Sequence, residues 1–186
     1  MAAPRKDNVK QKILSSTEEL IQVKQLNDIS LAEIAKAAGI SKGTLYYHYN
    51  SKDEILLDVT SAFLDEQLLD LIKWTQDKSK DTSIHRLVMY VVKRALLSTT
   101  IRMHLIYNAI LGNEEVRLKL LERYAIFQNQ IAQKIKERAN TIDGDFAAWL
   151  ILLICDGLNV QQQLKNSTFD IEKFTDELVN LAKRFE

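Results

Sequence analysis

The chain has 186 residues, a length typical of one medium domain or of a small module joined to a larger one. Apolar residues make up 46% of it, enough for a substantial core, and one proline with five glycines favours helices over a turn-rich β architecture. The formal net charge of zero gives no general indication of a nucleic-acid partner, and the single cysteine excludes an intramolecular disulfide framework.

The charges are distributed unevenly along the chain. Residues 1–52 carry eight Lys/Arg against five Asp/Glu, a net charge of +3, whereas residues 53–186 carry seventeen against twenty, a net charge of −3. A modest basic excess in the first part is what contact with phosphates requires. The lone cysteine fits a reducing cytosol and the N-terminus lacks an apolar segment, so we expect a cytoplasmic protein. The longest apolar run, residues 146–155, is too short to cross a bilayer, and we expect no membrane partner.

The first helix is expected from Asp7 to Val23, after an arm in which Arg5 and Lys6 either reach DNA or stay solvated. Its apolar positions follow helical spacing. They are Val9, Ile13, Leu14, Thr17, Leu20 and Ile21.

A helix-turn-helix pattern follows between Ser30 and Lys52. Ser30 and Glu33 form a capping-box start signal, and Gly39 can adopt the left-handed conformation that ends a helix. Ser41 then caps a second short helix, which directs Leu45 inward. Two short helices joined by such a turn commonly place the second one in the major groove of DNA, although an ordinary helical corner has the same pattern.

Residues 30–52 read SLAEIAKAAGISKGTLYYHYNSK and closely resemble the DNA-binding motif of the TetR family of bacterial transcriptional repressors. The resemblance covers about a quarter of the chain directly. Tyr49 departs from it, because the family often carries phenylalanine there. The resemblance implies a head that binds double-stranded operator DNA and a helical body that binds an effector and dimerises.

The remaining sequence predicts helices throughout, so the fold class is all-α. We expect helices from residue 52 to about 75, from 83 to 97, to 111 after an interruption at 99–100, from 114 past 135, from 146 to 164 and from 170 to 185. The predicted domains are a three-helix head at 1–52 and a larger body at 53–186. The last helix has a heptad-like apolar seam, whose partner is either this chain or a second copy.

Nine residues are candidates for DNA contact. The serines stand at helix starts where phosphates bind, the lysines are cations, the glycine allows close approach to the duplex, and the remaining side chains can meet base edges or the backbone. They are Ser30, Ser41, Lys42, Gly43, Thr44, Tyr46, Tyr47, His48 and Lys52. The resemblance implies DNA contact at Lys42, Gly43, Tyr46, Tyr47, His48 and Lys52, while each side chain can instead simply fill surface between helices.

Nine further residues are candidates for binding an effector, because they mix polar groups into apolar helical faces, as the pocket of the family does. They are Trp74, His104, Tyr107, Asn108, Tyr124, Phe127, Gln128, Trp149 and Asp156. The mixture predicts a small, mainly hydrophobic effector, with Asp156 favouring a positive charge if it is buried. Internal pairing, or a place at a dimer surface, explains each of these residues almost as well.

Catalysis finds little support in the sequence. The three histidines lie far apart, no cysteine cluster is present, and nothing resembles a nucleophile elbow or a phosphate-binding glycine loop. We therefore expect no enzyme activity, metal or cofactor.

The favoured function is a dimeric repressor released from its operator by an effector, with the helices at 146–164 and 171–185 forming the interface. The alternative is a helical interaction or antirepressor module with a degenerate head.

Overall fold

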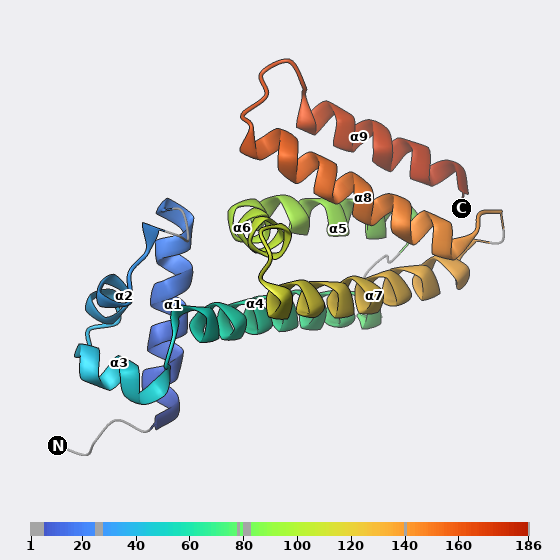
Figure 1. Cartoon of the computed structure of the whole chain (residues 1–186). Coiled ribbons are helices and arrows are strands. Elements are labelled where there is room, and N and C mark those ends of the chain that lie inside the picture. The colour runs from blue at the N-terminus through green and yellow to red at the C-terminus, as the bar shows by residue number, and fades with distance from the viewer. Residues whose placement is uncertain (1–5, 25–27, 78, 80–82, 140, 186) are drawn as a thin grey trace. The chain divides into compact units, whose positions relative to one another are not determined.

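The computed structural model describes residues 6–24, 28–77, 79, 83–139 and 141–185, so the predicted role of Arg5 lies outside the described residues. These residues form nine α-helices with no strand among them, which confirms the all-α class (Figure 1). The helices are α1 (Lys6–Val23), α2 (Leu31–Ala37), α3 (Lys42–His48), α4 (Lys52–Gln76), α5 (Ile84–Leu97), α6 (Thr99–Ile110), α7 (Glu114–Lys136), α8 (Gly144–Gln163) and α9 (Ile171–Ala182). A short 3-10 helix, η2 (Lys183–Phe185), follows α9.

The helices group into two compact units. Unit 1 comprises Met1–Leu64 and Thr100–Lys119, and unit 2 comprises Asp65–Thr99 and Leu120–Glu186. Helices α4 and α7 therefore contribute residues to both units, and α6 belongs with the N-terminal helices rather than with the rest of the body. The functional division at residue 52 remains a prediction, since compactness alone does not assign function.

Unit 1 is built on α1. Its predicted apolar face is buried except at Leu20, which is half-buried, and Ile13 and Ile21 are fully inaccessible. Helix α1 contacts α2, and α2 contacts α3. Because α2 and α3 have seven residues each, neither can be stable alone, and α2 is supported by α1 and α3 by α2.

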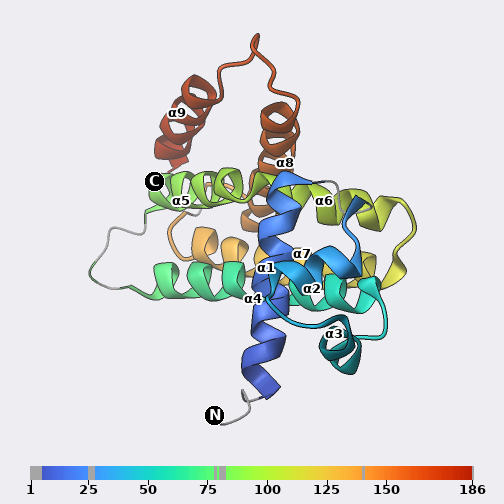
Figure 2. The same ribbon diagram turned by 90° about the vertical axis from the view of Figure 1, so that its left-hand side faces the viewer.

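Unit 2 is organised around α5, which packs against α8 and α9. Both views show α8 and α9 joined at one end and running antiparallel (Figures 1 and 2). Two arginines attach neighbouring helices to α4: Arg94 of α5 forms an ion pair with Asp70 at 2.6 Å, and Arg123 of α7 forms one with Asp65.

The apolar seam of α9 packs mainly within its own chain. Ile171, Phe174 and Leu178 lie against the core of unit 2, and Leu181 is 46% exposed. Of the two partners that the sequence left open, the same chain therefore accounts for most of this seam.

Helix α8 begins at Gly144, two residues earlier than predicted. The carboxylate of Asp143 accepts a hydrogen bond from the backbone N–H of Phe146 at 2.7 Å and so caps the helix.

Among the described residues, α8 alone is long and apolar enough to cross a membrane by length and composition, a test that core helices also pass. One of its sides is buried against the core of unit 2.

Candidate DNA-binding and effector sites

The capping box at the start of α2 is formed as predicted. The hydroxyl of Ser30 accepts from the backbone N–H of Glu33 at 3.2 Å, and the Glu33 carboxylate accepts from the backbone N–H of Ser30 at 2.9 Å. Lys24, one residue beyond α1, donates to the same carboxylate at 2.5 Å. This hydrogen bond, together with those from Ser30, lowers the pKa of Glu33 to about 2. The end of α1 is thereby attached to the start of α2.

The turn between α2 and α3 has the geometry that the sequence predicts. Gly39 has a φ of +65°, which glycine adopts without strain, and the N–H of Ile40 donates to the carbonyl of Ala35 at 3.0 Å. The hydroxyl of Ser41 then accepts from the backbone N–H of Thr44 at 3.0 Å and lies 2.8 Å from the Thr44 hydroxyl. These bonds fix the direction in which α3 leaves the turn.

Helix α3 has one buried side chain and a broad exposed face. Leu45 is fully buried, whereas Tyr46 is 54% and Tyr47 is 72% exposed. The rings of Tyr47 and His48 meet edge to face, with centroids 5.3 Å apart. Lys42 is exposed at the start of the helix and has no acidic partner within the described part of the chain. Two phenols, an imidazole and a cation therefore share an accessible helix, a set suited to DNA contact.

Gly43 lies in the exposed first turn of α3, where nothing in the free protein requires a glycine. A Cβ added there would meet the Ser41 hydroxyl oxygen at 3.8 Å, an ordinary contact. A glycine in a helix costs about 0.5–1 kcal/mol relative to alanine. Close approach of a duplex remains the predicted reason for this glycine.

Like Ser41, two further predicted DNA contacts already have structural roles. The ammonium group of Lys52 donates to the carbonyl of Ile29 at 3.2 Å and so joins the start of α4 to the segment before α2. The hydroxyl of Ser30 is engaged in the capping box. Both residues remain near the candidate surface, but they also hold the head together.

The predicted effector residues are divided between the two units. His104, Tyr107 and Asn108 belong to α6 in unit 1, and the other six belong to unit 2. The half-buried imidazole of His104 hydrogen-bonds to the backbone of Ile21 in α1, while Tyr107 is 53% exposed. Burial lowers the pKa of His104, and the hydrogen bond to Ile21 partly opposes that shift.

Within unit 2 the predicted residues have several different partners. Tyr124 donates to the carboxylate of Asp156 at 2.7 Å, which unites two of them. Gln128 instead donates to Asp145 at 3.1 Å, at the start of α8. Trp74 stacks on Tyr90, and Trp149 is 44% exposed on α8. The structure therefore pairs Tyr124 with Asp156 and packs Trp74, Tyr124 and Phe127 against the same core of unit 2, while Gln128 and Trp149 lie apart from that pair.

Residues 13–59 match the family model for bacterial regulatory proteins of the tetR family. This segment contains the whole helix-turn-helix together with most of α1 and the start of α4. These residues therefore form a DNA-binding domain of the TetR type.

Known proteins are similar to most of the chain. A nucleoid occlusion factor, SlmA, from Shewanella halifaxensis is 26% identical over 166 residues, covering 84% of each chain. The FadR regulator from Bacillus subtilis, solved in complex with stearoyl-CoA, superimposes with a TM-score of 0.70 at 17% identity, covering 92% of this chain and 96% of FadR. A TerR/AcrR-family regulator from Aquifex aeolicus gives 0.74 at 16% identity, covering 96% and 99%. At these identities the two structures show the fold alone.

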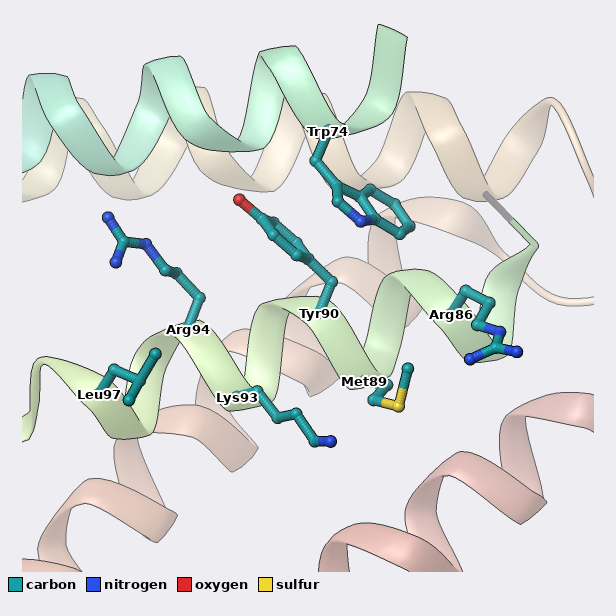
Figure 3. A pocket seen from close by; sticks show the side chains of 7 residues that line it. All are labelled: Trp74, Arg86, Met89, Tyr90, Lys93, Arg94 and Leu97. Atoms are coloured by element: carbon teal, nitrogen blue, oxygen red, sulfur yellow. The ribbon is translucent and has the colours of Figure 1, made fainter. Parts of the chain in front are cut away.

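A groove of about 450 Å³ in unit 2 was not predicted. Trp74 of α4 lines it together with six residues from the outward side of α5 (Figure 3). The six are Arg86, Met89, Tyr90, Lys93, Arg94 and Leu97. We call this site the α5 groove. The sequence shows that charged and apolar side chains both occur along residues 84–97. Only the packing of neighbouring helices shows which side of this helix remains uncovered.

Proposed function

We propose that this TetR-family protein is a dimeric repressor that binds double-stranded operator DNA through α3 and is released by a small, mainly hydrophobic effector. The exposed face of α3 carries the DNA-binding part of the proposal. Leu45 fixes the helix by its burial, which directs Tyr46 and Tyr47 to solvent beside Lys42. Two exposed tyrosines next to a cation suit the phosphates and base edges of a duplex.

A gel-shift titration with DNA from upstream of the gene tests this part. Lys42→Ala should weaken binding and lower the slope of log affinity against log salt by about one unit, since one phosphate contact is lost. Tyr47→Ala should lose affinity with an unchanged circular dichroism spectrum. Lys173→Ala, an exposed lysine of α9, is the matched control and should bind like the wild type. Wild-type affinity in both head variants would remove the assignment.

The effector part of the proposal rests on unit 2 and on the family. Tyr124 and Asp156 form a half-buried polar pair beside apolar side chains, and the similar FadR structure holds stearoyl-CoA. An effector that weakens DNA binding tenfold must prefer the non-binding state by about 1.4 kcal/mol, and DNA must weaken effector binding by the same factor. Titrating hydrophobic acids, cations and neutral compounds with and without operator tests this reciprocity. A ligand indifferent to DNA is not the effector.

A second candidate function is that of a DNA-bound nucleoid occlusion factor. The observation favouring it is the similarity to SlmA, which extends over 84% of both chains and so includes the body as well as the head. The two functions differ in where the protein binds. A repressor should occupy a few sites beside promoters, whereas a nucleoid factor should occupy many sites scattered over the chromosome. Mapping the bound sites in cells separates them.

A further inference from the structure

Thr44 differs from the other accessible side chains of α3. Lys42, Tyr46 and Tyr47 are exposed and end in an ammonium group or a phenol, whereas Thr44 is half-buried and carries the only methyl group among the accessible side chains of this helix. Ammonium groups and phenols suit phosphates, which position a protein on DNA without conveying sequence. The chemistry of Thr44 suits instead a small apolar contact with the edge of a base.

The hydroxyl of Thr44 is held by the residue that caps the helix. Its oxygen lies 2.8 Å from the hydroxyl oxygen of Ser41, which also accepts the backbone N–H of Thr44 at 3.0 Å. Whichever hydroxyl donates, one proton of the pair is used between them. Because the hydroxyl and the methyl share one β-carbon in separate staggered positions, a bond that holds the hydroxyl also holds the methyl in one direction. The methyl is therefore the part of Thr44 that remains for a base.

The residue before Thr44 allows a base to come near enough for so short a side chain. Gly43 is exposed, and a Cβ added to it would meet the Ser41 hydroxyl oxygen only at an ordinary contact distance of 3.8 Å. A glycine permits close approach of the backbone to a ligand. A base edge that approaches α3 at Gly43 comes within reach of the Thr44 methyl.

We infer that Thr44 reads one thymine in each half-site of the operator, with its methyl group against the C5 methyl of that base. This inference rests on the proposed DNA-binding function and assigns part of its sequence specificity to one residue. Thymine is the base that presents a methyl group in the major groove, and the methyl of a threonine is one of the groups that recognise it. The bond to Ser41 orients the methyl before DNA arrives, so little side-chain freedom is lost on binding.

The test replaces thymine by uracil, which removes the C5 methyl and keeps the base-pairing edge. The shortest upstream fragment that the full-length wild type shifts is prepared with single thymines changed to deoxyuridine, position by position. At one position in each half-site the dissociation constant should rise about three- to fivefold, the effect of one buried methyl group. The other thymines should tolerate the change.

Thr44→Ser supplies the protein side of the same contact. Serine keeps the hydroxyl and its bond to Ser41 but lacks the methyl. This variant should bind the unmodified fragment about ten- to twentyfold more weakly, because both heads of the proposed dimer lose one methyl contact. Uracil at the sensitive positions should then have no further effect, since the two changes remove the same interaction.

Thr168→Ser is the matched control, because Thr168 is exposed between α8 and α9 and its hydroxyl also donates to a neighbour, Asn166, at 2.7 Å. It should bind both kinds of fragment like the wild type. Wild-type binding that is indifferent to uracil at every thymine overturns the inference and leaves the proposed function standing. The same holds if Thr44→Ser keeps the full sensitivity to uracil. A wild type that shifts no upstream fragment contradicts the proposed DNA binding itself, and the inference fails with it.

Discussion

At the scale of single residues, Tyr49 fills the core of the head and also donates a hydrogen bond. It is 3% exposed, and its hydroxyl donates to Asp58 at 2.9 Å. Lys10 reaches the same carboxylate at 2.7 Å and lies 5.5 Å from the Tyr49 ring centroid. The residue that departs from the TetR pattern therefore adds a polar link between the end of α3, α1 and α4.

Replacing Tyr49 separates these two roles. Tyr49→Phe keeps the ring and loses one hydrogen bond, so we expect the free energy of unfolding to fall by about 0.5–1.5 kcal/mol. Tyr49→Ala leaves a cavity and should cost about 3–5 kcal/mol. Urea unfolding of both variants measures the difference. Equal costs would show that the hydroxyl, and not the ring, is the main contribution.

His104 predicts a dependence of stability on pH. Its pKa is lowered in the folded chain, so the folded state binds fewer protons than the unfolded state as the pH falls through the ordinary value of about 6.5. The stabilisation associated with neutral His104 is complete above that value and is lost on acidification through the folded pKa. Urea midpoints at pH 7.5 and 5.5 should differ less in His104→Gln than in the wild type. An identical difference in both would exclude His104 as a source.

At the scale of elements, the start of α8 depends on a glycine. A Cβ at Gly144 would meet Cγ of Lys136 at 2.6 Å and the carbonyl oxygen of Ala132 at 3.0 Å, so α7 and α8 approach too closely for a side chain. A Cβ at Gly157, later in the same helix, would meet nothing within 4 Å. The two glycines therefore form a matched pair.

We expect Gly144→Ala to destabilise the protein by about 1–3 kcal/mol through overpacking. Gly157→Ala should be neutral or stabilising by up to about 1 kcal/mol, because alanine is the better helix former. Thermal unfolding compares the two variants. A melting temperature as high for Gly144→Ala as for Gly157→Ala would mean that Lys136 moves aside at no cost.

Local signals account for what the sequence could predict about the elements. The sequence predicts α1, α2 and α3 correctly from their apolar spacing, the capping serines and the left-handed Gly39. Each of these signals acts within a few residues. The start of α8 was misplaced by two residues, because the prediction did not recognise Asp143 as the helix cap. The sequence also could not decide the partner of the α9 seam, because heptad spacing describes a face and not what covers it.

At the scale of the whole molecule, the prediction of the effector residues was limited because a sequence pattern describes one face of a helix and not what covers that face. Mixed polar and apolar faces were recognised one helix at a time, and a pocket requires several helices to converge. The structure shows that Gln128 is engaged at the start of α8 and that His104 belongs with α1. The α5 groove was not predicted, because only the packing of α5 against other helices shows which of its sides remains uncovered.

An exposed apolar stripe on α8 supports the proposed dimer. Its members follow spacings of three and four residues and are 38–69% exposed, although the opposite side of the helix is buried in unit 2. They are Phe146, Trp149, Leu150, Leu153, Val160 and Leu164. A contiguous apolar surface of this kind marks an interaction site, and a two-fold dimer covers it with its own copy.

Leu153→Asp tests the dimer better than a change at Leu178, which packs on the chain's own core and would disturb the fold as well. Leu153 is 63% exposed, so an aspartate there should leave the monomer folded but place an unpaired charge in the dimer interface. Sedimentation should show a wild-type dimer and a folded monomeric variant. Half-sites one helical turn of DNA apart, about 34–36 Å, require two heads, so the variant should also lose cooperative operator binding. A wild-type monomer, or a variant that still dimerises, would contradict this use of the stripe.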